Sequence, residues 1–154
     1  MAGLSTTGWV IHTPVSCPHI SWVSLSLEAG PHSVLMAAKD ELGRLGEDIA
    51  AAWLTDRGIK VLVRNWRCPE GELDIVATDD EYVIFCEVKT RSGDLFGSPF
   101  EAVTQGKRRK IRRLAQLCVA DLPIRGFPPF RFDVIGVMCR PGQLPTVEHR
   151  PRAF

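Results

Sequence analysis

The chain has 154 residues, a length typical of one domain, and 45% hydrophobic with 24% charged residues is typical of a soluble globular protein. The net charge of only +1 means that the overall charge balance does not by itself indicate a nucleic-acid-binding protein. The cysteines are scattered singly, without C-x-x-C spacing, which excludes a zinc-finger type of site and indicates reduced thiols in a cytosolic protein. We therefore expect a cytoplasmic localisation.

Residues 1–35 differ in composition from the rest of the chain. They contain nine Ser or Thr, three Pro and one charged residue, Glu28. The segment lacks the basic start and continuous apolar stretch of a signal peptide, and Pro, His and Ser interrupt it too often for a membrane span. We expect a disordered N-terminal extension over residues 1–35 and an α/β domain over residues 36–154. A chain that starts at Met36 should then fold as stably as the full chain.

The domain is expected to begin with a helix over residues 40–57. Apolar residues recur there at helical spacing, and Gly58 follows as a C-terminal glycine should. The expected inward face holds Leu42, Leu45, Ile49 and Trp53, with Gly46 and Ala50 beside them. Residues 59–65 predict a short strand, and residues 66–71 a loop.

Residues 72–78 and 81–90 predict a β-hairpin, because both are rich in β-branched and apolar residues and Asp79-Asp80 can form a two-residue turn. Side chains alternate along a strand, so two sets of residues should occupy opposite faces. The apolar set, expected in the core, is Leu73, Ile75, Ala77, Tyr82, Ile84, Cys86 and Val88. The other set is Glu72, Asp74, Val76, Val83, Phe85, Glu87 and Lys89. This register places Asp74 opposite Phe85, and Glu72 opposite Glu87.

The second face carries a candidate metal site. Asp74 and Glu87 would be diagonal neighbours, close enough for one cation to lie between their carboxylates. Lys89 lies two residues after Glu87, so its ammonium can neutralise part of the negative charge and orient water. This arrangement suits hydrolysis of a phosphodiester. An acidic residue and a lysine at this spacing also occur as an ordinary surface ion pair, so that alternative stays open.

A second helix is expected over residues 101–122, after a loop that contains Arg91. Its inward residues should be Val103, Ile111, Leu114, Ala115 and Cys118. Six of the seven residues at 107–113 are basic, which indicates either a solvated helix face or a phosphate-binding surface. The candidate phosphate-binding residues are Arg91, Lys107, Arg108, Arg109, Arg112 and Arg113.

The remaining elements complete an α/β domain. After a Pro- and Gly-rich connector at 123–129, residues 131–138 predict a strand in which Asp133 is expected to be structural rather than catalytic. Residues 146–149 predict an edge strand. Helix, strand, hairpin, helix and strand in this order predict a small mixed β-sheet, apolar on both faces and flanked by helices.

Five blocks in this order resemble the YraN family, small bacterial proteins with a restriction-endonuclease-like fold. The blocks are GRLGE at 43–47, GELDIV at 71–76, FCEVKTR at 85–91, Lys107, and RFDV at 131–134. The family is in turn similar to archaeal Holliday-junction resolvases and other PD-(D/E)-x-K nucleases. The resemblance covers nearly all of residues 40–138, although Leu73 stands where the proline of that motif is expected.

The resemblance implies roles for four residues. Asp74 and Glu87 would be metal-binding carboxylates and Lys89 the catalytic lysine. Glu47 would be a helix-borne acid that also serves the metal. On the helix pattern alone, Glu47 is equally a solvated glutamate.

These residues and the resemblance together predict a nucleic-acid-binding protein, with DNA the expected partner, that hydrolyses phosphodiesters with Mg²⁺ or Mn²⁺. Hard oxygen ligands suit these ions. Two alternatives remain: a non-catalytic nucleic-acid-binding module on a nuclease fold, and a structural adaptor whose acidic cluster merely pairs with Lys89 and Arg91. A homodimer is compatible with the sequence, and no membrane partner is expected.

Overall fold

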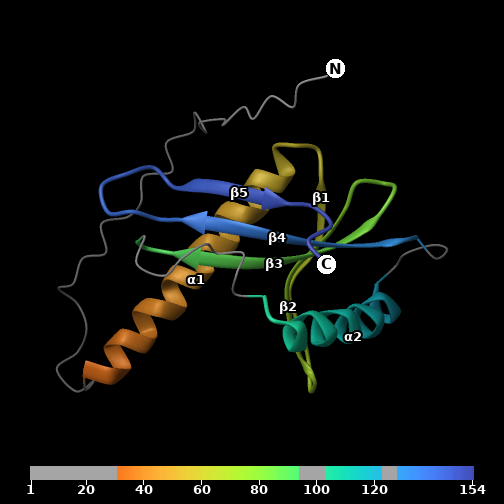
Figure 1. Ribbon diagram of the computed structural model, residues 1–154, viewed down its shortest axis with the longest axis horizontal. Coiled ribbons are helices and arrows are strands. Elements are labelled where there is room, and N and C mark those ends of the chain that lie inside the picture. Colours follow the sequence, from red (N-terminus) through yellow and green to blue (C-terminus); the bar gives the residue numbers. More distant parts are fainter. Residues whose placement is uncertain (1–30, 94–102, 123–127) are drawn as a thin grey trace.

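Five strands and two helices make up the part of the chain described by the computed structural model, which is residues 31–93, 103–122 and 128–154 (Figure 1). Residues 1–30 of the predicted N-terminal extension lie outside the described residues. In chain order the elements are α1 (Pro31–Thr55), β1 (Lys60–Cys68), β2 (Gly71–Thr78), β3 (Val83–Arg91), α2 (Gln105–Asp121), β4 (Phe130–Met138) and β5 (Thr146–Arg150). Helix α1 begins at Pro31, before the expected domain boundary at Met36. None of the described helices is long and apolar enough to cross a membrane.

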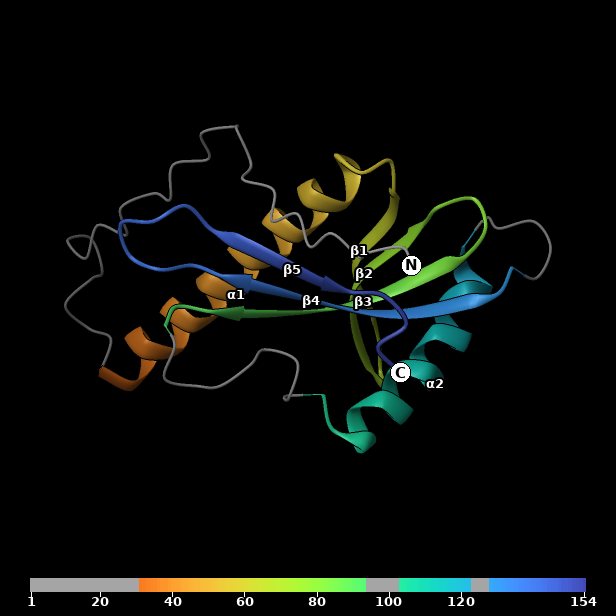
Figure 2. The ribbon, with the colours of Figure 1, turned by 45° about the horizontal axis from the view of Figure 1, so that its top comes forward.

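The strands form one mixed sheet in the order β1-β2-β3-β4-β5 (Figure 2). Neighbouring strands are antiparallel except β3 and β4, which are parallel. A parallel pair needs a crossover connection, and the segment that contains α2 supplies it. The predicted mixed α/β architecture is therefore confirmed, and it is compatible with a small nuclease-like fold.

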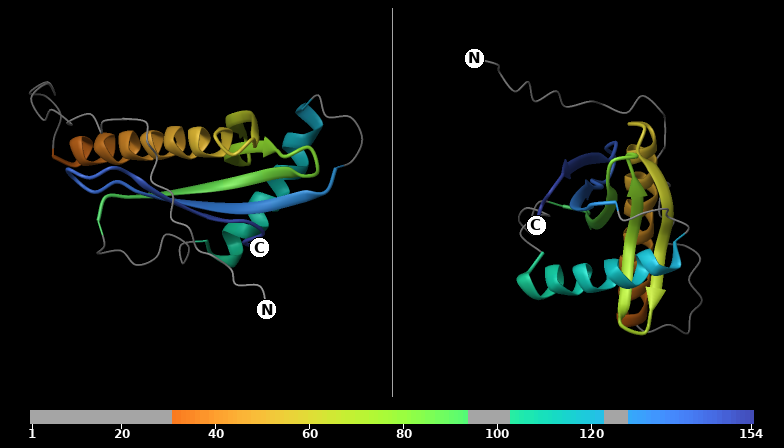
Figure 3. Two further views of the ribbon diagram at one scale, coloured as in Figure 1. Left: turned by 90° about the horizontal axis from the view of Figure 1, so that it is seen from above. Right: turned by 90° about the vertical axis from the view of Figure 1, so that its right-hand side faces the viewer.

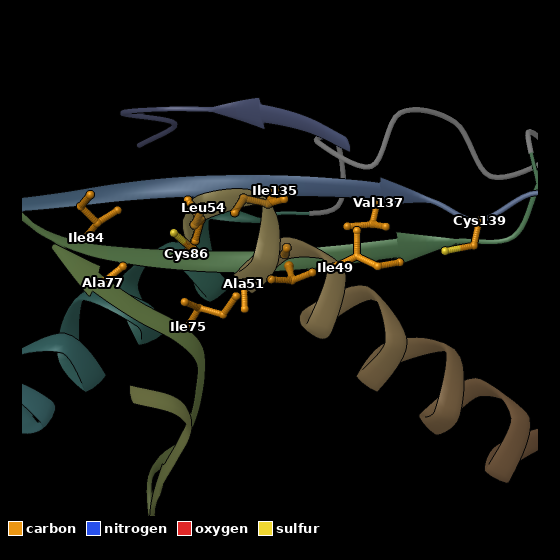
Figure 4. Close-up of a cluster of buried hydrophobic side chains, with 12 residues drawn as sticks. Ile49, Ala51, Leu54, Ile75, Ala77, Ile84, Cys86, Ile135, Val137 and Cys139 are labelled. Atoms are coloured by element: carbon orange, nitrogen blue, oxygen red, sulfur yellow. The ribbon is translucent and has the colours of Figure 1, made fainter. Parts of the chain in front are cut away.

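The two helices cover opposite faces of the sheet, so the domain has three layers (Figure 3). The α1 face is filled by Ile49, Ala50 and Leu54 of the helix, packed against strand residues such as Ile75, Cys86 and Ile135 (Figure 4). The α2 face is filled by Ile111, Leu114, Ala115 and Cys118 of the helix against Val76, Val83 and Phe85. Helices on both faces explain why the strands are apolar on both sides.

Two small residues let helix α1 lie close to the sheet. Gly46 and Ala50 are buried beside Ile49, whereas Leu42, Leu45 and Trp53 of the predicted face are half-buried. A Cβ atom at Gly46 would lie 1.8 Å from Oγ1 of Thr90 on β3. The absence of a side chain at Gly46 therefore lets α1 approach the part of β3 that carries Lys89 and Arg91.

The turn between β2 and β3 differs from the prediction. Thr78 pairs with Val83, so the loop is Asp79–Tyr82 and not a two-residue turn at Asp79-Asp80. The Asp79 carboxylate accepts hydrogen bonds from the backbone N–H groups of Glu81 and Tyr82, which closes the wider loop. The register shifts by two residues, an even number, so the paired residues 75–78 and 83–86 keep their predicted faces. The predicted pairings of Asp74 with Phe85 and of Glu72 with Glu87 are wrong.

The β1–β2 hairpin extends beyond the rest of the sheet and crosses α2 (Figure 3). Its strands continue to a turn after Cys68, where a loop over residues 66–71 was predicted. Leu73 packs with the α2 cluster, although alternation predicted it beside Ile75. Leu73 lies past the last β2–β3 pair, where only β1 accompanies β2. Two-stranded ribbons twist more strongly than wide sheets, so alternation does not fix its face there.

Asp133 on β4 is fully buried and has a structural setting, as expected. It accepts hydrogen bonds from the Arg131 guanidinium and the Arg152 N–H, and pairs with His149 Nε2 at 2.8 Å. Arg131 also contacts Asp79 at 2.5 Å, so this network joins β4 to the β2–β3 loop. Buried Cys86 and Cys118, predicted as core thiols, are free cysteines.

Candidate functional site

The candidate site lies where β2 and β3 part. Their last backbone pair is Ile75 with Cys86, and the next step of this register brings Asp74 level with Glu87. There the Asp74 side chain replaces the backbone ladder, because its Oδ2 accepts a hydrogen bond from the Val88 N–H at 2.8 Å. Ile75, Cys86 and Val88 point into the α1 core. The predicted division of faces around Asp74 and Glu87 is confirmed.

Glu87 is the most enclosed member of the site, with 4% of its side chain exposed. Its Oε1 lies 2.5 Å from Lys89 Nζ and 3.1 Å from Lys107 Nζ. Lys89 comes from the same strand and Lys107 from the first turn of α2, so two separate elements supply its cations. Removing a carboxylate from water is costly unless it is paired, and these two ammonium groups provide the pairing.

Asp74 has a strongly perturbed acidity. Burial and the negative charge of Glu87 raise the pKa of Asp74 to about 7, although the Val88 N–H and the charges of Lys107 and Lys89 act in the opposite direction. A carboxyl group that titrates near neutrality, beside a second carboxylate and two lysines, is typical of functional sites.

Glu72, which alternation predicted on the face of Asp74 and Glu87, does not join these two carboxylates. Glu72 is exposed and pairs with Arg67 at 3.2 Å, away from Glu87. Repulsion on this face is therefore between Asp74 and Glu87.

Glu47 is not gathered with these carboxylates. Among the residues that the structure describes, no three His, Cys, Asp or Glu side chains lie close enough together to hold a metal ion. Glu47 belongs to α1, which packs on the face of the sheet opposite to α2 and Glu87. Its role as a helix-borne acid stays a prediction.

The predicted phosphate-binding residues on α2 have different surroundings. Arg113 is held by Glu70 through two hydrogen bonds of 3.2 Å. The guanidinium groups of Arg108 and Arg112 lie 5.6 and 5.7 Å from the centre of the Phe154 ring. Arg109 is exposed. Three of these arginines therefore already have contacts, although Arg112 and Arg113 are exposed like Arg109.

Arg91 ends β3, on the same face as Glu87 and Lys89. Its Nε is buried and has no hydrogen-bond partner in the described part of the chain. A buried, unsatisfied guanidinium nitrogen is costly, which makes Arg91 a candidate for binding an anion.

Sequence reasoning missed the β1–β2 hairpin as part of this region. A pocket between the hairpin and α2 is lined by Arg67, Lys110 and Lys107, among others. Lys110 belongs to the basic run but was not selected as a candidate. Its spacing of three residues from Lys107 is the signal that both face the same side of the helix.

Comparison with known proteins decides the family. The model of an uncharacterised protein family, UPF0102, matches residues 46–137. The chain belongs to UPF0102. The resemblance to the YraN family is thereby confirmed, since the two names denote one family.

Relatives within UPF0102 match over most of their length. A UPF0102 protein of Frankia casuarinae is 52% identical over 77% of this chain and 100% of its own. A UPF0102 protein of Nocardia farcinica is 47% identical over 75% of this chain and 91% of its own. The UPF0102 match includes Asp74, Glu87, Lys89 and the whole of α2.

Proposed function

We propose that this protein binds nucleic acid and hydrolyses its phosphodiester bonds with Mg²⁺ or Mn²⁺ held by Asp74 and Glu87. The observation that carries the proposal is the meeting of these two carboxylates with Lys89 and Lys107 at the point where β2 and β3 part. DNA is the nucleic acid that the resemblance to resolvases and PD-(D/E)-x-K nucleases favours.

The donor set fits a magnesium-like ion. Mg²⁺ is commonly bound through one or two carboxylates together with waters and substrate phosphates, so Glu47 is not required as a third ligand. When bound, such an ion polarises the phosphate and lowers the pKa of a coordinated water. Burial and the repulsion by Glu87 raise the pKa of Asp74, and a cation between the two carboxylates would relieve the repulsion.

The protein's own residues have separate tasks in this proposal. Asp74 is oriented by the Val88 N–H, and Glu87 by the two lysines. Lys89 now donates a hydrogen bond to Glu87. In the proposed reaction it would donate to the phosphate and stabilise the charge that develops there. Arg91 and the exposed part of α2 would bind flanking phosphates, which gives affinity without sequence preference.

One observation favours a second candidate, a non-catalytic nucleic-acid-binding module. Glu87 is already neutralised by two ammonium groups without any metal. If both lysines stay paired with Glu87, the surface can bind nucleic acid but does not hydrolyse it.

Cleavage assays separate the two candidates. Branched, single-stranded and duplex DNA are incubated with the protein, with and without Mn²⁺, beside the variants Asp74→Asn, Glu87→Gln and Lys89→Ala. The enzyme proposal expects metal-dependent cleavage that each substitution lowers by about a hundredfold or more. Glu81→Gln, which removes an exposed carboxylate from the β2–β3 loop, is the matched control and should cleave like the wild type. Cleavage by all three variants at the wild-type rate would refute catalysis at this site.

A further inference from the structure

An unassigned feature near the site is the pocket between the end of the β1–β2 hairpin and α2, with a volume of about 400 Å³. This is within the range of small-ligand sites, roughly 300–1,000 Å³. Buried Ile111 and Leu114 of α2 form part of its lining, so its base belongs to the rigid core.

The charged groups around the pocket are mainly positive. Arg67, Lys107 and Lys110 line it, against a single acid, Glu72. Arg67 pairs with Glu72, and Lys107 with Glu87. No carboxylate of the described residues forms an ion pair with Lys110. The pocket therefore retains positive charge that its own walls do not neutralise.

The hairpin turn provides the room for Lys110. A Cβ atom at Gly71 would lie 2.7 Å from Lys110 Cε and 2.9 Å from its Nζ. Gly71 also has φ +149°, a conformation that other residues rarely adopt. The ammonium group of Lys110 thus lies close to Gly71, and both residues line the pocket.

Lys107 joins this pocket to the candidate site. Its side chain lines the pocket, while its Nζ lies 3.1 Å from Glu87 Oε1. A phosphate in the pocket and one at Asp74 and Glu87 would therefore be neighbours on either side of a single lysine. Successive phosphates of a nucleic-acid strand are neighbours in the same way.

We propose that this pocket binds a backbone phosphate of a nucleic-acid strand, through Lys110 and Lys107, beside the phosphate at Asp74 and Glu87. The inference rests on the nucleic-acid binding proposed above and specifies the path of the strand, along the first turns of α2 and past the tip of the β1–β2 hairpin.

Lys110→Gln tests the subsite, and Lys39→Gln is its control. Both remove one charge from an exposed helix position, but Lys39 belongs to α1, on the other face of the sheet, and does not line the pocket. Binding of a fluorescent oligonucleotide is measured against salt concentration. Lys110→Gln should weaken binding about threefold to tenfold and lower the salt slope by about one, and Lys39→Gln should weaken it less than about twofold. Equal effects of the two substitutions would overturn the proposal.

Inorganic phosphate provides a readout that needs neither cleavage nor nucleic acid. Phosphate added to the full-length protein should shift the backbone amide NMR signals of Cys68, Gly71 and Lys110, and these shifts should be lost in Lys110→Gln and kept in Lys39→Gln. An unlabelled oligonucleotide should displace the phosphate.

The two proposals fail in different ways. Phosphate shifts without displacement by the oligonucleotide would overturn the strand path and show a site for free phosphate only. Metal-dependent cleavage with no shifts and no specific effect of Lys110→Gln would overturn the pocket and leave the proposed function standing. Shifts at Gly71 with no nucleic-acid binding by the wild type would overturn the proposed function, and the strand path with it.

Discussion

Asp74 is a carboxyl group under opposing influences. Burial and Glu87 favour its protonated form, while the Val88 N–H and two lysines favour its anion, and the balance raises its pKa to about 7. An ordinary aspartate in an unfolded chain titrates near 3.9. The folded protein therefore binds an extra proton between about pH 4 and pH 7, and this residue lowers stability as the pH rises through that interval.

Asp74→Asn should stabilise the metal-free protein more at pH 8 than at pH 5. Asparagine keeps an oxygen that can accept the Val88 hydrogen bond and removes the repulsion by Glu87. We expect a gain on the order of 1–3 kcal/mol at pH 8, from a pKa shift discounted for solvent screening. At pH 5 the carboxyl is neutral in the folded protein but ionised in the unfolded chain, so the gain should be only about a third of that at pH 8. Urea denaturation at both pH values measures this, and an equal gain at both would contradict the assigned pKa.

Asp133 behaves in the opposite way. Burial alone would raise its pKa, but hydrogen bonds from His149, Arg131 and the Arg152 N–H hold the pKa below its usual value. Asp133→Asn should cost about 3–5 kcal/mol, because Arg131 and His149 lose a buried charge partner. The contribution is present above the unfolded pKa and is lost as the pH falls through the folded one. Wild type and variant should therefore converge only in acid, below the usual aspartate range. Exposed Asp80→Asn is the control for urea denaturation.

At the scale of elements, the close approach of α1 to β3 positions the site. Glycine at 46 leaves room for Thr90, which lies between Lys89 and Arg91 on β3. Helix α1 therefore supports this part of β3 from the face of the sheet opposite to Lys89 and Arg91. Helix α2 supplies Lys107 from the near face.

Gly46→Ala should destabilise the protein although alanine is the better helix former. The new methyl group would lie 1.8 Å from Thr90 Oγ1, so the helix or the strand must move. We expect a loss of about 1–3 kcal/mol from overpacking. Gly43→Ala is the matched control, because nothing lies within 4 Å of a Cβ at that position. It should gain about 0.5–1 kcal/mol. Thermal unfolding of both variants measures the difference, and a stabilised Gly46→Ala protein would show that α1 does not depend on this contact.

At the scale of the whole molecule, charge is distributed unevenly although its sum is only +1. Helix α2 concentrates basic residues at 107–113, on the face of the sheet that also carries Asp74 and Glu87. Lys107 pairs with Glu87 and Arg113 with Glu70, so the number of charged groups overstates the number available to phosphate.

Neutralising the basic run should reduce the salt dependence of nucleic-acid binding. A variant with Gln at Lys107, Arg108, Arg109, Arg112 and Arg113 should bind all sequences more weakly and lose about one unit of slope for each phosphate contact removed. Arg113→Gln alone should change the slope less than the other single substitutions, because Glu70 already holds this guanidinium. An unchanged slope in the combined variant would mean that the run is only a solvated helix face.

Much of the fold could be predicted from local patterns. Helical spacing located both helices, and the inward residues Ile111, Leu114, Ala115 and Cys118 of α2 are buried. Alternation placed Asp74, Glu87 and Lys89 on one face. This placement holds although the predicted turn was wrong, because the register differs by an even number of residues. Such features depend on the period of a single element, which a sequence displays directly.

Tertiary structure decided what depends on the meeting of separate elements. The wider β2–β3 loop is held by Arg131 from β4, and the twist of the β1–β2 ribbon carries Leu73 to the α2 side. Lys107 reaches Glu87, while Glu47 stays with the opposite helix. The pocket at Lys110 exists only because the hairpin crosses α2 there. Contacts between residues far apart in the chain depend on strand divergence and helix position, which no local period specifies.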